Sequence, residues 1–205
     1  MAHAGYSTSF KKAVATLQNN PYPEQTALRH GAVYHANSID LTYFGRSYEI
    51  ELPEYVFLPD DLSLGEKILI LHYLLSDGPR EEHPATATFE GLRGGMFYFE
   101  TFKKRGPARV RNNFKDKPLI LREIAAASGW REGNTGDISI IIPALPLIEI
   151  TVVMYTADEE FPAEVTFLFR KDIVSLLPLE DIAALGGFAA TRLAILKDKF
   201  IKGRL

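Results

Sequence analysis

The 205-residue sequence contains no cysteine. That absence excludes disulfides, a thiol nucleophile, a Cys-ligated zinc site and a conventional Cys-ligated iron–sulfur cluster in this chain. Long apolar runs are missing as well, since none approaches the roughly 20 residues of a membrane-spanning helix. The opening segment, MAHAGYSTSFKKAV, lacks the basic-then-apolar order of a signal peptide. We therefore expect a cytoplasmic protein that does not bind a membrane.

Several short motifs that mark common chemistries are also absent. The chain has no HExxH metal motif, no GxxxxGK[ST] phosphate loop and no GxGxxG dinucleotide fingerprint. It has no GxSxG nucleophile elbow, and the DxHxxG signature of base-off cobalamin binding is missing. We expect no metal site, and no familiar catalytic constellation is apparent in the sequence.

Charge is distributed unevenly along a chain whose formal net charge is −3. Residues 103–117, KKRGPARVRNNFKDK, hold seven Lys/Arg and one Asp, whereas the rest carries 16 Lys/Arg against 25 Asp/Glu. A nucleic-acid-binding domain is usually basic overall or along one face. Nucleic acid is therefore a disfavoured partner, whereas the basic segment can still bind a small anion or an acidic protein.

The length and the apolar content fit one globular domain, residues 1–205, with a sizeable core. Helices are predicted where apolar residues recur at helical spacing or where a good start signal occurs. These helices are expected at 6–19, 24–30, 64–76, from 118 to about 129, and from 178 towards the C-terminus. Residues 96–104 and 106–112 are expected to be helical or turn-like, and a short strand is expected near 86–90.

Strand signals occur in pairs that suggest antiparallel neighbours. Apolar residues alternate with polar ones on both sides of Gly45, which predicts a hairpin over 38–52 with a type II′ turn. Strands are also predicted at 137–142, 147–155 and 165–169, with the segment PALP as a linker between the first two. Paired strands with flanking helices favour an α+β fold, mainly an antiparallel sheet with a long C-terminal helix.

Four segments together resemble an uncharacterised family, domain of unknown function 3786 (DUF 3786). They are HYLLSDG at 72–78, FEGLRGGMFYFETFKKR at 89–105, VVMYTADEEFPAEVTFLF at 152–169 and LPLEDIAALGG at 177–187. The resemblance covers about residues 25–195 and rests on the order and spacing of these segments. It implies an origin in anaerobic bacteria or archaea. Some relatives carry a Cys-rich iron–sulfur segment like that of corrinoid proteins, so a redox role here would need a separate partner chain.

The acidic run Asp158-Glu159-Glu160 is one candidate site. Its carboxylates can coordinate a hard cation, or repel one another so that one becomes a general acid. The alternative is a solvated turn between two strands, in which Phe161-Pro162 holds the loop on the core. Successive extended side chains point to opposite sides, which favours the turn. Asp158 and Glu160 are the stronger functional candidates.

The second candidate is the Gly-Gly segment. Arg93, Gly94 and Gly95 can form a backbone nest for an anion, and Phe97 and Tyr98 can stack on a flat ligand. Lys103 and Arg105 can then meet phosphates or carboxylates, as in a tetrapyrrole or a nucleotide. The alternative is a tight turn that leads into a helix with a solvated basic end.

His72 is the third candidate, because it lies within an apolar helical run. A histidine in such a place is most often a hydrogen-bonded core residue. The alternatives are a general base or an axial ligand to haem iron or corrinoid cobalt. His30 and His35 are five residues apart, which does not place them on one helix face.

We expect a non-catalytic ligand-binding or accessory module of anaerobic metabolism, whose ligand is a tetrapyrrole, a corrinoid or another anion. The first rival is an enzyme that uses Asp158 or Glu160 as acid/base with help from His72. The second rival is an interaction domain that docks an iron–sulfur or corrinoid partner through the basic segment. The sequence leaves the identity of any cofactor open.

Overall fold

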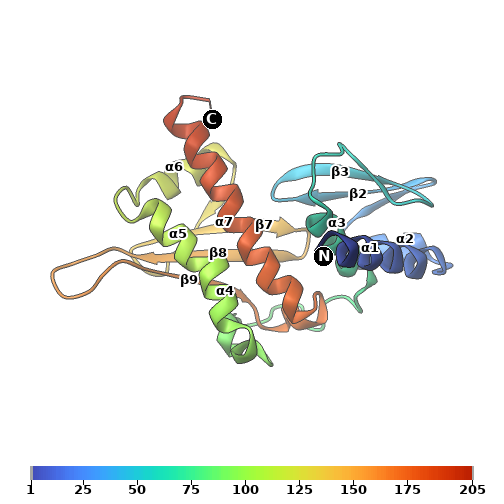
Figure 1. Ribbon diagram of the computed structural model, residues 1–205, viewed down its shortest axis with the longest axis horizontal. Helices are drawn as coiled ribbons and strands as arrows, with labels where there is room; N and C mark the ends of the chain where they lie inside the picture. The colour runs from blue at the N-terminus through green and yellow to red at the C-terminus, as the bar shows by residue number, and fades with distance from the viewer. Residues whose placement is uncertain (1, 205) are drawn as a thin grey trace.

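The computed structural model describes residues 2–204 and shows two antiparallel sheets with flanking helices (Figure 1). The four-stranded sheet has the order β1 (Val33–His35), β2 (Ser38–Tyr43), β3 (Arg46–Glu51), β4 (Val56–Leu58). The five-stranded sheet has the order β5 (Thr86–Thr88), β9 (Glu164–Arg170), β8 (Ile148–Tyr155), β7 (Ile138–Leu145), β6 (Arg131–Glu132). The predicted α+β class is confirmed, with two sheets where the sequence indicated one.

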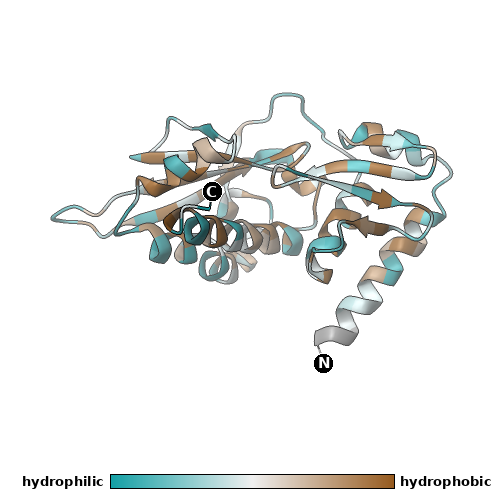
Figure 2. Cartoon of the chain, turned by 90° about the horizontal axis from the view of Figure 1, so that it is seen from above, coloured by the Kyte–Doolittle hydropathy of each residue, from teal (hydrophilic) through white to brown (hydrophobic). Residues whose placement is uncertain are grey.

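The helices divide between the two sheets. They are α1 (Ala2–Gln18), α2 (Pro23–Arg29), α3 (Leu64–Leu75), α4 (Phe99–Arg105), α5 (Pro107–Phe114), α6 (Ile120–Ala127) and α7 (Leu179–Ile201). Helices α4, α5 and α7 cover one face of the five-stranded sheet, whereas α1 and α3 pack together beside the smaller sheet (Figures 1 and 2). Short 3₁₀ turns complete the chain: η1 (Phe89–Gly91), η2 (Gly95–Phe97) and η3 (Lys171–Ser175). No helix within residues 2–204 has the length and apolarity needed to cross a membrane.

The β2–β3 hairpin joins the two sheets. The buried residues Ile39, Leu41 and Tyr43 follow the predicted alternation, and Tyr43 pairs with Arg46. The loop is therefore Phe44-Gly45, and both residues have positive φ, +50° and +78°. That pattern is type I′, so the predicted type II′ turn was wrong, because Gly45 takes the second central position.

Phe44 is held in its left-handed conformation by contacts with the rest of the protein. Its N–H donates to the carbonyl of Ala144 at 3.0 Å, and its ring lies under the guanidinium of Arg192. Ala144 belongs to β7, so the predicted PALP linker was wrong: the strand runs through Pro143 to Leu145, with a shift of register there. One cluster of buried apolar side chains includes residues of both sheets.

Helix α3 follows its sequence signals closely. Ser63 accepts a hydrogen bond from the Glu66 N–H, and the Glu66 carboxylate accepts one from the Ser63 N–H, which forms the predicted capping box. Apolar side chains are buried on most sides of this helix. His72 is its polar residue facing α7, and the chain leaves the helix at Ser76.

Candidate functional site

Two of the three candidate segments meet at the first turn of α7. Nδ1 of His72 donates to Oδ2 of Asp181 at 2.6 Å. The Tyr98 hydroxyl donates to Oε1 of Glu180 at 2.7 Å. Helix α7 thus presents two consecutive carboxylates, one bound to the His72 helix and one to the Gly-Gly segment.

The acidic turn lies elsewhere, at the tip of the β8–β9 hairpin, which projects away from α3 (Figure 1). Oδ1 of Asp158 accepts hydrogen bonds from the N–H groups of Glu160 at 2.9 Å and Phe161 at 2.7 Å. Asp158 thereby folds its own turn. Phe161 is 66% exposed, so the expectation that it holds the loop on the core was wrong. The structure does not bring Asp158 or Glu160 to His72.

The Gly-Gly segment forms a tight turn with its own hydrogen bonds. Gly94 has a φ of +83°, and a Cβ at Gly95 would lie 1.9 Å from the carbonyl oxygen of Phe89. The Gly95 N–H donates to Leu92, and the N–H groups of Phe97 and Tyr98 donate back to Gly94 and Gly95. These three donors are used inside the turn, and the close approach to Phe89 requires glycine at position 95.

The other residues predicted with that nest do not gather around one cavity. Arg93 is exposed, and the Phe97 ring is 91% exposed. Lys103 lies beside a cavity of about 40 Å³, which is too small for a tetrapyrrole. Arg105 lies against Gly187 of α7.

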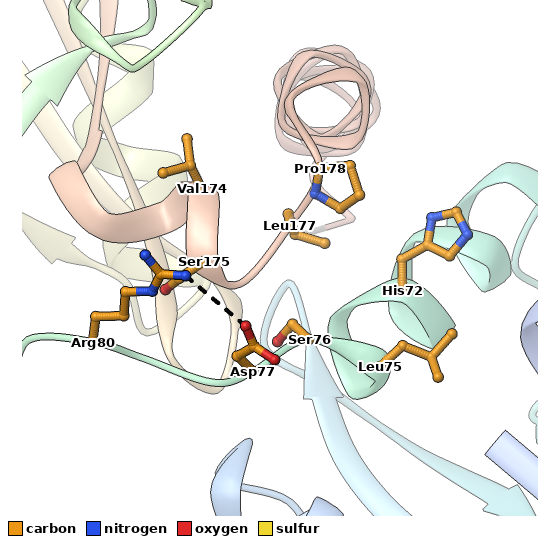
Figure 3. A pocket seen from close by; sticks show the side chains of 9 residues that line it. All are labelled: His72, Leu75, Ser76, Asp77, Arg80, Val174, Ser175, Leu177 and Pro178. Carbon is orange, nitrogen blue, oxygen red and sulfur yellow. Dashed lines mark ion pairs between the residues drawn. The ribbon is translucent and has the colours of Figure 1, made fainter. Parts of the chain in front are cut away.

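A larger cavity of about 390 Å³ lies where α3 ends and α7 begins. We call it the α3–α7 cleft. Its lining residues are His72, Leu75, Ser76, Asp77, Arg80, Val174, Ser175, Leu177 and Pro178. In Figure 3, His72 and Arg80 lie at opposite ends, with Ser76 between them.

The loop at 76–81 forms one wall of the cleft and is held in place by two residues of the η3 turn. The Ser175 hydroxyl donates to the Gly78 carbonyl at 3.0 Å. Oδ2 of Asp172 accepts from the backbone N–H groups of Arg80 and Glu81, both at 3.1 Å. This wall is therefore held in place by hydrogen bonds within the protein.

Asp172 is buried and paired with Arg170. Nε and Nη2 of Arg170 donate to the two carboxylate oxygens at 2.5 and 2.9 Å. Burial alone would raise the pKa of Asp172, but Arg170 and the N–H groups of Glu81 and Arg80 outweigh it and lower the pKa. The carboxylate thus stays ionised and keeps its hold on the loop.

Ser76 is bound to the fully buried His30. Nε2 of His30 lies 2.8 Å from the Ser76 Oγ, and Nδ1 lies 2.7 Å from the Thr26 carbonyl. Because a carbonyl only accepts, Nδ1 carries the proton and Nε2 accepts from the Ser76 hydroxyl. Burial lowers the pKa of His30, which favours this neutral form, and Arg29 acts in the same direction.

His72 differs from His30 in its surroundings. Its side chain is 30% exposed, and Asp181 holds its Nδ1. Within residues 2–204, Nε2 of His72 has no hydrogen-bond partner. A carboxylate on Nδ1 fixes the tautomer and the ring orientation and leaves Nε2 free for a ligand or a proton.

Sequence reasoning missed His30, Ser76, Arg80, Asp172 and Asp181. Three of them have no local motif that marks them. Ser76 and Asp181, however, lie inside HYLLSDG and LPLEDIAALGG, two of the segments that carry the family resemblance. Among the described residues, no group of three or more His, Cys, Asp or Glu is placed to hold a metal ion.

The sequence model of one protein family, described as a domain of unknown function (DUF3786), matches residues 22–192 of the chain. The chain belongs to the DUF3786 family. No curated protein and no solved structure matches it. The region that this DUF3786 chain shares with the family model includes both walls of the α3–α7 cleft.

Proposed function

We propose that this DUF3786 protein is a ligand-binding module and that a small anionic ligand binds in the α3–α7 cleft. The observation that carries the proposal is the anchoring of the cleft's polar groups. Asp181 orients His72, His30 orients Ser76, and Asp172 fixes the backbone of Arg80. Groups held in place by partners outside the site lose little entropy when a ligand binds, which favours affinity.

Arg80 gives the cleft its preference for an anion. The side chain is 72% exposed, and its acidic neighbour Asp77 lies 3.9 Å away. An exposed pair at that distance contributes little, so the guanidinium remains available. Arginine binds a carboxylate or a phosphate through two parallel hydrogen bonds.

The cavity volume of about 390 Å³ suits a small metabolite. It lies near the lower end of the roughly 300–1,000 Å³ range of small-molecule sites. A tetrapyrrole or corrinoid would extend beyond the cleft, and His72, oriented by Asp181, would be the residue that could hold its metal through Nε2. We therefore favour a smaller anion as the ligand. We also propose that the protein has an accessory role in anaerobic metabolism.

Isothermal titration calorimetry, with a panel of small carboxylates and with inorganic phosphate, tests the proposal by measuring the affinity for each anion. Arg80→Gln should weaken binding by at least tenfold, because one charged hydrogen bond contributes about 1.5–3 kcal/mol. Arg93→Gln is the matched control, since Arg93 is exposed outside the cleft. Equal affinity in wild type and Arg80→Gln, or no binding of any anion in the panel, would contradict the proposal.

A second candidate function is docking of an acidic iron–sulfur or corrinoid protein. It is favoured by the exposure of Met96 and Phe97, 71% and 91%, beside the basic helices α4 and α5. Association with an acidic ferredoxin should weaken strongly at about 0.5 M salt, where charge contacts are screened. Phe97→Ala should also weaken it. Association that is insensitive to both changes would remove this candidate.

A further inference from the structure

We propose that Ser76 is a nucleophile with His30 as its general base, and that the α3–α7 cleft hydrolyses a small ester carrying an anionic group. This inference goes beyond binding, because it assigns a reaction to the cleft. It rests on the proposed function only in that the substrate's anionic group is expected to bind as proposed above. The nucleophile and base stand on their own geometry.

The two side chains have the arrangement of an activated serine. Oγ of Ser76 lies 2.8 Å from Nε2 of His30, and Nδ1–H of His30 donates to the Thr26 carbonyl at 2.7 Å. A nucleophile within hydrogen-bond reach of a base, with the base oriented by a third group, is the pattern of covalent catalysis. Here a backbone carbonyl takes the orienting place that a carboxylate fills in a Ser-His-Asp triad.

A further contact fixes the direction of the Ser76 hydroxyl. Oγ accepts the Gly78 N–H at 3.3 Å, so its own proton points to His30. Gly78 has a φ of +88°, and a Cβ there would lie 2.7 Å from the Arg29 side chain, so this turn requires glycine. Ser76 itself is half-buried and lines the cleft. Its oxygen therefore keeps one lone pair that is not used in these two hydrogen bonds and could attack a carbonyl carbon bound in the cleft.

The base has the protonation state that the step requires. His30 is fully buried, and burial lowers its pKa below the ordinary value of 6.5. The lone pair on Nε2 is consequently available at neutral pH. The Thr26 carbonyl also stabilises the imidazolium that forms during the reaction.

Ser175 provides a matched serine in the same cleft. Its hydroxyl lies 3.0 Å from the Gly78 carbonyl and 2.8 Å from the Asp172 carbonyl, and it donates to them. A hydroxyl directed at carbonyl acceptors has no base to remove its proton. Ser175 is therefore expected to be unreactive.

The proposed reaction has two steps, acylation of Ser76 and hydrolysis of the acyl-serine. Oγ of Ser76 attacks the ester carbon while its proton moves to Nε2 of His30. The carbon–oxygen bond to the alcohol then breaks, and the leaving oxygen takes that proton. Water next attacks the acyl-serine and passes a proton to Nε2. The bond to Oγ breaks, Oγ recovers the proton, and a carboxylic acid is released. Arg80 holds the anionic group throughout.

A neutral fluorophosphonate probe tests the nucleophile directly, with the modified residue located by peptide mass spectrometry. We expect Ser76 to displace fluoride and carry the phosphonyl group. Ser76→Ala should abolish the label, and Ser47→Ala, which changes an exposed serine outside the cleft, should keep it. His30→Gln should slow labelling by about 10²–10⁴-fold, the usual contribution of a general base. Circular dichroism checks that this variant is folded.

The wild-type result decides the proposal even if His30→Gln does not fold. No label on Ser76, or the same labelling rate in native and urea-unfolded protein, overturns it. Failure of the proposed anion binding can be distinguished from failure of the proposed nucleophile. If Ser76 is labelled but no carboxylate or phosphate binds, the anion proposal alone fails. If anions bind through Arg80 but Ser76 is not labelled, the nucleophile alone fails.

Discussion

Replacing Asp172 by alanine should destabilise the protein more than any change at the exposed acidic turn. The substitution removes both carboxylate contacts of Arg170 and leaves the N–H groups of Arg80 and Glu81 without their acceptor. Breaking a buried ion pair by removing one partner costs about 3–5 kcal/mol. Arg170 keeps the carbonyls of Leu147 and Glu81 as partners, so we expect the lower end, about 3 kcal/mol.

Urea unfolding followed by circular dichroism measures this loss. The midpoint should fall with little change in the slope m, because the folded state stays compact. Glu159→Ala is the control, since Glu159 is exposed, and it should stay within about 0.5 kcal/mol of wild type. A loss of less than about 1 kcal/mol in Asp172→Ala would contradict the stabilising role of the Asp172–Arg170 pair.

The same carboxylate makes stability depend on acid pH. The pKa of Asp172 is lower in the folded protein than its ordinary value of 3.8. Its stabilisation is therefore fully present above pH 3.8 and is lost as the pH falls through the lower folded value. Asp172→Asn should be less stable than wild type at neutral pH, and this difference should shrink under acid. A constant difference between pH 7 and about 3 would contradict the assignment.

Two further predictions concern a glycine and the buried histidine. Gly95→Ala should cost at least about 3 kcal/mol or prevent folding, because its Cβ would lie 1.9 Å from the Phe89 carbonyl oxygen. In Gly91→Ala the new Cβ would lie 3.5 Å from Oγ1 of Thr88, so the free energy of unfolding should remain near that of wild type in the same urea assay. For His30, the lowered folded pKa means that the unfolded chain binds more protons below pH 6.5. The free energy of unfolding should thus fall below that pH by up to about 1.4 kcal/mol per unit, and His30→Gln should flatten the slope. Equal slopes in both proteins would count against a neutral buried His30.

The parts of the fold that sequence reasoning predicted well are specified by neighbouring residues. The alternation across the β2–β3 hairpin and the Ser63–Glu66 capping box are local signals, and both are confirmed. The turn type was missed because it depends on the register Tyr43–Arg46, which the sequence does not state. Similarly, the steric need for glycine at position 95 depends on the position of Phe89, which the sequence does not give.

The candidate site was less predictable because its contacts join distant segments. His72 and Asp181 are 109 residues apart, and His30 and Ser76 are 46 apart. The sequence indicated His72 as a candidate, but nothing local identified its carboxylate partner. It also placed the hydrogen-bonded core histidine at position 72, whereas the structure shows that His30 is fully buried. The packing of α3 against α2 and α7 decides both roles.

Native mass spectrometry can show directly whether the α3–α7 cleft holds a small anion. Protein purified gently without oxygen should show extra mass that disappears on denaturation and that identifies the ligand class. The extra mass should be absent from an Arg80→Gln, His72→Gln double variant and retained in Arg93→Gln. A wild-type mass equal to the bare chain, or the same bound mass in the double variant, would contradict the claim.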